Sequence, residues 1–294
     1  MRHAGIEFEI GNVPELDRGF VPFGKWLDAY LRQADRPIRA AVQREDGRVV
    51  VFDGALRGAA WEEANQRYLE RWVKLLLWSV GGSRVWLTGC DGLARQLRED
   101  YRPGGRRSFD VDFMQTVFER PFEVVPCSAG DFPRACPGGQ AGGGRLGGHL
   151  EGCRIGFDAG GSDRKVSAVI DGKAVYSEEV VWHPKLSEDP DYQYREILTA
   201  FETAAAHLPR VDAIGVSSAG VLVGNHPMVS SLFIKVPKAR HEAVKHIYER
   251  AAGAIGNVPL AVANDGDVTA LAGAMGLNRG RVLGIAMGTS EAAG

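Results

Sequence analysis

The second half of the chain has the alternating strand and helix pattern of an α/β protein. Its apolar runs are short, and amphipathic segments with apolar residues at helical spacing separate them. Strands are predicted at 154–158, 166–170, 175–181, 213–216, 259–263 and 282–287, and helices at 194–207, 240–255 and 266–275.

The first half has a different pattern, in which β-like runs precede one long amphipathic helix. Residues 39–43 and 48–53 are separated by Arg-Glu-Asp-Gly, which predicts a hairpin. Trp61 to Val80 has apolar residues at helical spacing, and Gly81-Gly82 then gives a typical helix end. Further strands at 84–88 and 122–125 and helices at 91–101 and 110–118 predict an α+β domain over residues 1–133.

A glycine-rich segment separates the two halves. Residues 134–152 read RACPGGQAGGGRLGGHLEG, with almost no large apolar side chain. Such a composition favours a flexible linker. We therefore expect three parts: an α+β domain at 1–133, a linker at 134–152 and an α/β lobe at 153–294.

Charge and composition narrow the classes of function. The 294 residues contain 35 basic and 37 acidic side chains, and residues 1–150 contain 21 basic and 20 acidic ones. Neither the whole chain nor its first 150 residues has the excess of basic side chains that favours nucleic-acid binding. No apolar run approaches the roughly 20 residues of a membrane span, and the N-terminus lacks a secretory apolar core. The four cysteines lack metal-ligand spacing. We expect a cytoplasmic protein with no membrane partner.

The stretch RIGFDAGGSDRKVSAVIDG, residues 154–172, is the most informative part of the sequence. A strand ends at Asp158, and the turn Gly160-Gly161-Ser162 follows. Glycine lets backbone N–H groups approach a ligand closely, and successive amides can form an anion site. A carboxylate beside them suits a divalent cation, so the motif favours phosphate with magnesium. The alternative is an ordinary hairpin with a glycine turn.

Two further strand ends carry polar motifs. Asn264-Asp265 follows the strand at 259–263, and Gly288-Thr289 follows the strand at 282–287. Ligand sites of α/β sheets gather at such ends. The order Asp-x-Gly-Gly-Ser, Asn-Asp-Gly-Asp, Gly-Thr-Ser resembles the ROK family of sugar kinases and repressors, within the actin, hexokinase and chaperone ATPase superfamily.

The resemblance covers about residues 152–294 and implies a ribonuclease-H-like ATPase lobe, in which the strands at 154–158, 166–170 and 175–181 look like the first three, antiparallel strands. Family members continue past the position that matches Gly294 with most of a second lobe. We therefore expect that this chain is a fragment whose second lobe is incomplete. The preceding α+β domain matches no element of the family, so its role stays open.

The resemblance also implies roles for individual residues. Asp265 is the expected catalytic base, and Asn264 and Gly220 are expected beside the sugar. Phosphate contacts are implied for Asp158, Gly160, Gly161, Ser162, Gly288 and Thr289, with Asp158 orienting Mg²⁺ through water. The implied cofactors are ATP and Mg²⁺, the implied partners are a sugar and a nucleotide, and family habit suggests a homodimer.

Several positions depart from the family pattern. Ser162 replaces the usual threonine, no proline precedes Gly220, and Asp267 adds a carboxylate two residues after the expected base. In the structural alternative, Asn264 to Gly266 form a loop and Asp267 caps the next helix. Two other functions stay open: a noncatalytic sugar-sensing regulator, and a superfamily ATPase without a sugar substrate.

Overall fold

The computed structural model describes residues 1–44, 46–136, 147–287 and 291–294. The chain divides into two compact units, Met1–Gly142 and Gly143–Gly294, which are described separately. The division falls inside the glycine-rich segment 134–152. Residues 137–146 of that segment lie outside the described residues, so its role as a linker stays a prediction.

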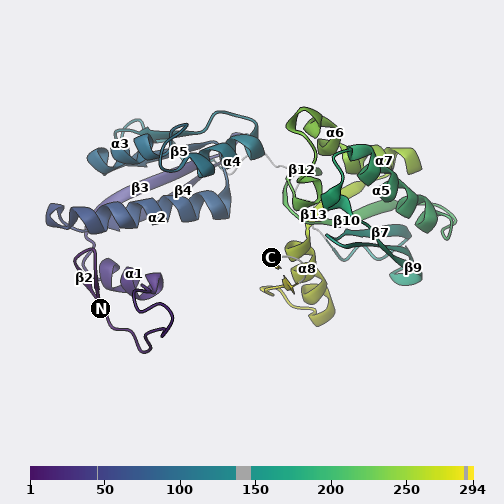
Figure 1. The fold of residues 1–294 in the computed structure, drawn as a ribbon, viewed down its shortest axis with the longest axis horizontal. Coiled ribbons are helices and arrows are strands. Elements are labelled where there is room, and N and C mark those ends of the chain that lie inside the picture. The colour runs from purple at the N-terminus through teal and green to yellow at the C-terminus, as the bar shows by residue number, and fades with distance from the viewer. Residues whose placement is uncertain (45, 137–146, 288–290) are drawn as a thin grey trace. The chain divides into compact units, whose positions relative to one another are not determined.

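The second unit is built on a five-stranded sheet in the order β13-β10-β7-β8-β9 (Figure 1). The strands are β7 (Cys153–Ala159), β8 (Asp163–Ile170), β9 (Lys173–Val181), β10 (Ala213–Ser218) and β13 (Leu260–Asn264). β7, β8 and β9 pair antiparallel, whereas β10 and β13 continue the sheet parallel to β7. This order is ribonuclease-H-like and confirms the predicted fold class.

Helices α5 (Pro190–Ala205) and α7 (Ile247–Ile255) cover one face of this sheet (Figure 1). Asp189 caps α5 through the backbone N–H of Asp191, and Pro190 occupies the first turn, where no N–H is needed. Phe157 of the sheet meets Phe201 of α5 edge to face, with ring centroids 5.4 Å apart. Alternate residues of the strands therefore form one apolar core with the two helices.

The predicted helix at 240–255 is wrong in one respect, because it consists of two pieces. α6 (His241–Lys245) ends at His246, whose φ of −102° and ψ of 17° are not helical, and α7 begins after it. The sequence also gave no sign of the small hairpin β11 (Val221–Val223) and β12 (His226–Val229). Short 3-10 helices occur at Pro184–Leu186, Ser231–Phe233 and Lys238–Arg240.

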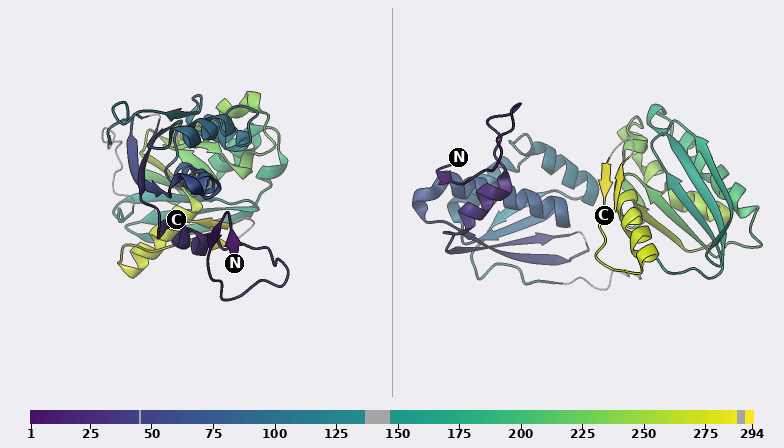
Figure 2. Two further views of the ribbon diagram at one scale, coloured as in Figure 1. Left: turned by 90° about the vertical axis from the view of Figure 1, so that its left-hand side faces the viewer. Right: turned by 90° about the horizontal axis from the view of Figure 1, so that it is seen from below.

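The last part of the chain packs on itself. The hairpin β14 (Ile285–Met287) and β15 (Glu291–Ala293) lies along α8 (Asp265–Leu277), as Figure 2 shows. A Cβ atom on Gly266 would come within 2.6 Å of the backbone of Ala293, so only glycine allows this approach. The hairpin is closed by two backbone hydrogen bonds between Gly284 and Gly294.

The first unit contains a four-stranded sheet in the order β4-β3-β5-β6. Its elements are β3 (Arg36–Gln43), β4 (Val49–Leu56), β5 (Arg84–Thr88), β6 (Glu123–Pro126), a 3-10 turn (Ala59–Trp61), α2 (Glu62–Val80), α3 (Asp91–Asp100) and α4 (Ser108–Phe118). The predicted hairpin is confirmed by the antiparallel β3–β4 pair, and β6 lies parallel to β5. No helix in the described part of the chain is long and apolar enough to cross a membrane.

The N-terminal elements of this unit were not predicted from the sequence; they are β1 (Arg2–His3), β2 (Ile6–Glu7) and α1 (Phe23–Leu31). Trp26 and Tyr30, four residues apart on α1, are fully buried and stack with ring centroids 5.2 Å apart. Tyr30 also stacks on Tyr68 of α2, at 4.8 Å. Leu75 belongs to the helical apolar pattern of α2, yet its exposed fraction is 63%.

Candidate functional site

A cleft of about 540 Å³ lies in the second unit, at the carboxyl ends of the central strands. Its walls come from the β7–β8 turn, the end of β10, the first turns of α8 and strand β14. The strand register places Asp158 beside Ser217, and Ser217 beside Ala263. Residues paired across a sheet face the same side, so this row points the Asp158 and Ser217 side chains toward one region.

Most of the predicted phosphate-binding residues line this cleft together with the predicted base. Asp158, Gly160, Gly161 and Ser162 contribute one wall, and Asp265 contributes another. Asp158 and Asp265 are both half-buried. The tertiary structure therefore brings together two carboxylates that lie far apart along the chain.

The β7–β8 turn is held by Trp182, which is buried beneath it. The indole N–H of Trp182 donates to the carbonyl of Gly160 at 2.8 Å, and its backbone N–H donates to the carbonyl of Ser162 at 3.1 Å. A Cβ on Gly160 would lie 2.6 Å from the carbonyl oxygen of Asp163. Glycine is therefore required at position 160 by the geometry of the turn itself, and not only by the close approach of a ligand that the sequence suggests.

Two lysines bring positive charge to the cleft. Lys165 pairs with Asp163 and, at 3.7 Å, with Glu179. The hydrogen bond from Lys165 lowers the pKa of the Asp163 carboxyl, and the same bond raises the pKa of Lys165. Lys185, from the 3-10 helix after β9, also lines the cleft. Lys185 and Asp163 were not predicted as site residues, and no sequence motif marks Lys185.

Asp265 lies at the N-terminus of α8. Asp265 occupies the first helical position, where the helix dipole favours a negative charge. One of its carboxylate oxygens accepts a hydrogen bond from the backbone N–H of Gly266 at 3.1 Å. The hydroxyl of Thr269 donates to the backbone carbonyl of Asp265 at 2.8 Å, which fixes the first turn.

The structure corrects the predicted helix cap. Asn264 is the N-cap of α8, since its side-chain oxygen accepts from the N–H of Gly266 at 2.9 Å. The expectation that Asp267 caps the helix is wrong, because Asp267 lies inside its first turn, is exposed and lines a separate groove. The second carboxylate of the motif is thus directed away from the cleft.

Asn264 and Gly220, the residues expected beside the sugar, are bonded to each other. The side-chain amide of Asn264 donates to the carbonyl of Gly220 at 2.8 Å. Gly220 has φ of +123°, and a Cβ there would lie 2.3 Å from the carbonyl of Val229. Asn264 and Gly220 do not line the cleft themselves, but each is next in sequence to a residue that does, Asp265 and Ala219 respectively. Their contact with a sugar stays a prediction.

Gly288 and Thr289, expected at a second phosphate loop, lie outside the described residues. Ala286 and Met287, which precede them, line the cleft.

The chain was compared with known families, curated proteins and solved structures. No family model matches it, and neither does any curated protein. Among solved structures, the inorganic polyphosphate/ATP-glucomannokinase from Arthrobacter sp. strain KM is 22% identical, with a TM-score of 0.39, and the match covers 49% of this chain and 57% of that one.

Two ROK proteins also match. The ROK hexokinase from Thermus thermophilus is 19% identical, with a TM-score of 0.35, over 48% of this chain and 46% of that one. A ROK family transcriptional regulator, a homolog of the E. coli MLC protein, is 20% identical, with a TM-score of 0.34, over 49% and 36%. The matches thus span between 36% and 57% of the length of these three structures.

The strand order and the antiparallel and parallel pairings define the architecture of the second unit. Residues 153–294 have the ribonuclease-H-like fold that the resemblance to ROK proteins predicted.

Proposed function

We propose that the second unit is the substrate-binding lobe of an ATP-dependent sugar kinase. The observation that supports this proposal is the shared cleft of Asp158, the Gly160–Ser162 turn and Asp265, at the carboxyl ends of β7 and β13, the two strands that flank β10. Phosphoryl transfer requires a base near the acceptor hydroxyl, donors around the phosphates and a divalent cation. The cleft offers a residue type for each of these requirements.

In the proposed reaction Asp265 acts as the general base. Its carboxylate accepts the proton of a sugar hydroxyl, and the hydroxyl oxygen forms a new bond to the terminal phosphorus of ATP. The bond between that phosphorus and the bridging oxygen breaks, which leaves ADP. The half-buried position of Asp265 at the start of α8 keeps its carboxylate next to the cleft.

The residues of the cleft fit a magnesium nucleotide. Mg²⁺ prefers oxygen ligands and keeps several of its waters, and the Asp158 carboxylate provides such an oxygen. When bound, the ion would neutralise charge on the phosphates. Lys185 and the backbone of the β7–β8 turn can contact anionic oxygens, and Lys165, which is paired with Asp163 and Glu179, adds positive charge nearby.

The proposal is tested with Asp265→Asn in the intact protein. ADP release is measured with MgATP and a panel of hexoses and hexosamines. We expect Asp265→Asn to lower sugar-dependent turnover by about 10²- to 10⁴-fold, because general-base catalysis contributes that much. Sugar binding, measured by the shift in thermal unfolding, should be retained.

The matched control is Asp267→Asn, two residues along the same helix, whose side chain lines another groove. It should leave turnover within about twofold of the wild type. If Asp265→Asn and the wild type had equal turnover, the proposed role of Asp265 as the general base would be wrong. If the wild type binds a sugar without releasing ADP, the sugar-sensing alternative replaces the kinase.

A further inference from the structure

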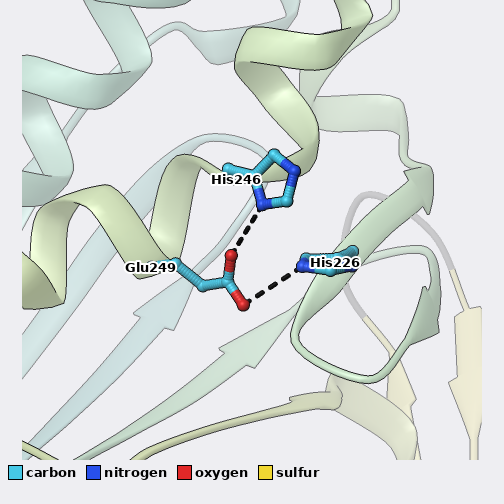
Figure 3. Close-up of side chains that lie close together, drawn as sticks. All are labelled: His226, His246 and Glu249. Carbon is cyan, nitrogen blue, oxygen red and sulfur yellow. Dashed lines mark hydrogen bonds and ion pairs between the residues drawn. The ribbon is translucent and has the colours of Figure 1, made fainter.

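Three side chains with metal-ligating atoms meet in the second unit, and none of them lines the cleft. They are His226, His246 and Glu249, and their ligand atoms all lie within 4.8 Å of one another (Figure 3). Nε2 of His226 lies 3.1 Å from one carboxylate oxygen of Glu249, and Nδ1 of His246 lies 2.7 Å from the other. The two imidazole rings meet edge to face, with centroids 4.6 Å apart.

The backbone around His226 is fixed before any ligand binds. His226 is the first residue of β12 and directly follows Asn225. The Asn225 side chain both donates a hydrogen bond to the edge strand β13 and accepts one from it. Its amide donates to the carbonyl of Leu260 at 3.2 Å, and its oxygen accepts from the N–H of Val262 at 3.0 Å. The His226 ring therefore projects from a turn that is anchored to the sheet.

The other two residues are anchored by the start of α7. His246 is the residue at which α6 ends and α7 begins, and Glu249 follows three positions later, on the same side of the helix. Between them, Ile247 and Tyr248 are fully buried, and the Tyr248 hydroxyl bonds Ser218 at 2.7 Å. The packing of these two residues in the core thus fixes the backbone positions of His246 and Glu249.

A fourth side chain completes the pattern of a metal site. Glu242 approaches Nε2 of His246 at 3.4 Å, while Nδ1 of the same ring faces Glu249. Histidines that bind a metal through one ring nitrogen commonly donate the other N–H to a carboxylate, which fixes the ring and its tautomer. Glu242 stands where such a partner would stand.

We propose that His226, His246 and Glu249 bind one Zn²⁺ ion, with Glu242 as the positioning residue. Two imidazole nitrogens and one carboxylate oxygen suit zinc, whereas magnesium prefers a site made of oxygens. In a tetrahedral zinc site neighbouring ligand atoms lie about 3.4 Å apart, so a small opening of the cluster admits the ion. A water would take the fourth position, because the three side chains are 27%, 39% and 41% exposed.

Bound zinc would tie the β11–β12 hairpin to the first turn of α7. That hairpin follows Gly220 and leads to Ser230, whose hydroxyl donates to the carbonyl of Ala219 in the cleft lining. The site would act as a clamp on a segment beside the cleft, and it is independent of the proposed kinase reaction.

The experiment is a titration of the full chain with Co²⁺, followed by its visible absorption, and then displacement by Zn²⁺. We expect one equivalent of Co²⁺ with a tetrahedral spectrum. His226→Gln and His246→Gln should each weaken affinity by roughly 100-fold or more, and Glu242→Gln by about tenfold. His207→Gln, an exposed histidine that stacks on Tyr176, is the matched control and should bind as the wild type does.

Thiolate-to-cobalt absorption bands in the wild type would assign the metal to cysteine and overturn the proposal. Equal affinity in the wild type and His226→Gln would also overturn it, as would the absence of a bound equivalent. Circular dichroism of each variant confirms that it is folded. Should a histidine variant not fold, Glu249→Gln, which keeps the size of the side chain, provides the same comparison.

Discussion

Aspartates lie at both ends of the five-stranded sheet, but they have different roles at the two ends. At the starting end, Asp212 accepts a hydrogen bond from the N–H of Cys153 at 2.8 Å and pairs with Arg210 at 2.7 Å. Asp171 accepts from the N–H of Gly152 at 2.8 Å. At the carboxyl end, Asp158 and Asp265 line a cleft.

The difference shows that residue type alone does not mark a functional acid. The carboxylates at the starting end hold the backbone where β7 and β10 begin. Those at the carboxyl end face a space large enough for a ligand. Substitutions at the two ends should therefore separate ligand binding from stability.

Among three further substitutions that test this difference, the largest effect is expected for Asp158→Asn at the carboxyl end. Loss of the carboxylate should weaken magnesium-dependent nucleotide affinity by about tenfold or more, because a neutral amide attracts the cation less strongly. Isothermal titration with MgADP, and with ADP in excess chelator, measures the effect. Asp212→Asn serves as the control from the opposite end of the sheet. If both variants bind MgADP equally well, the distinction between the ends fails.

A smaller effect is expected for Asn264→Ala, which acts on structure beside the cleft. The change removes the cap of α8 and the hydrogen bond to Gly220, and it should lower the free energy of unfolding by ~1 kcal/mol. Urea unfolding measures it. Asn264→Ser keeps a capping oxygen and should recover part of the loss. Equal losses in the two variants would show that the cap contributes nothing.

The smallest effect is expected for the pH dependence set by Asp212. The hydrogen bond with Arg210, and then that with the N–H of Cys153, hold the pKa of its carboxyl below the ordinary 3.8. A lowered pKa stabilises the folded protein above pH 3.8, and this contribution is lost as pH falls through the folded-state value.

Asp212→Asn should therefore lower the urea midpoint at neutral pH and flatten its fall under acid conditions, below about pH 4. Unfolding midpoints of the variant and the wild type across this range measure the effect. Parallel curves for the two proteins would contradict the role given to Asp212.

The strands of the second unit were largely predictable because each apolar run is short and ends in glycine or a polar residue. The runs at 154–158, 166–170 and 175–181 all lie within β7, β8 and β9. The N-terminal helix α1 was missed although Phe23, Trp26, Leu27, Tyr30 and Leu31 have helical spacing, so the sequence did carry a signal for this nine-residue helix. The break at His246 was missed because 240–255 reads as one amphipathic segment.

The candidate site was predictable only in part. The sequence singled out Asp158, the Gly160–Ser162 turn and Asp265, which the structure places around one cleft. It assigned Asn264 to the sugar and the cap to Asp267, whereas the fold uses Asn264 as the cap. Asn and Asp both cap helices well, so the sequence could not choose between positions three residues apart.

The sequence by itself determined the strand runs and the polar motifs at their ends, because period and turn residues are local properties. Only the tertiary structure decided which side chains meet. The parallel register of β7, β10 and β13 brings Asp158 and Asp265 to one cleft. The anchoring of Asn225 to β13 brings His226 to His246 and Glu249. Contacts between distant segments depend on which strands pair, and the residue pattern within one strand does not specify its partner strand.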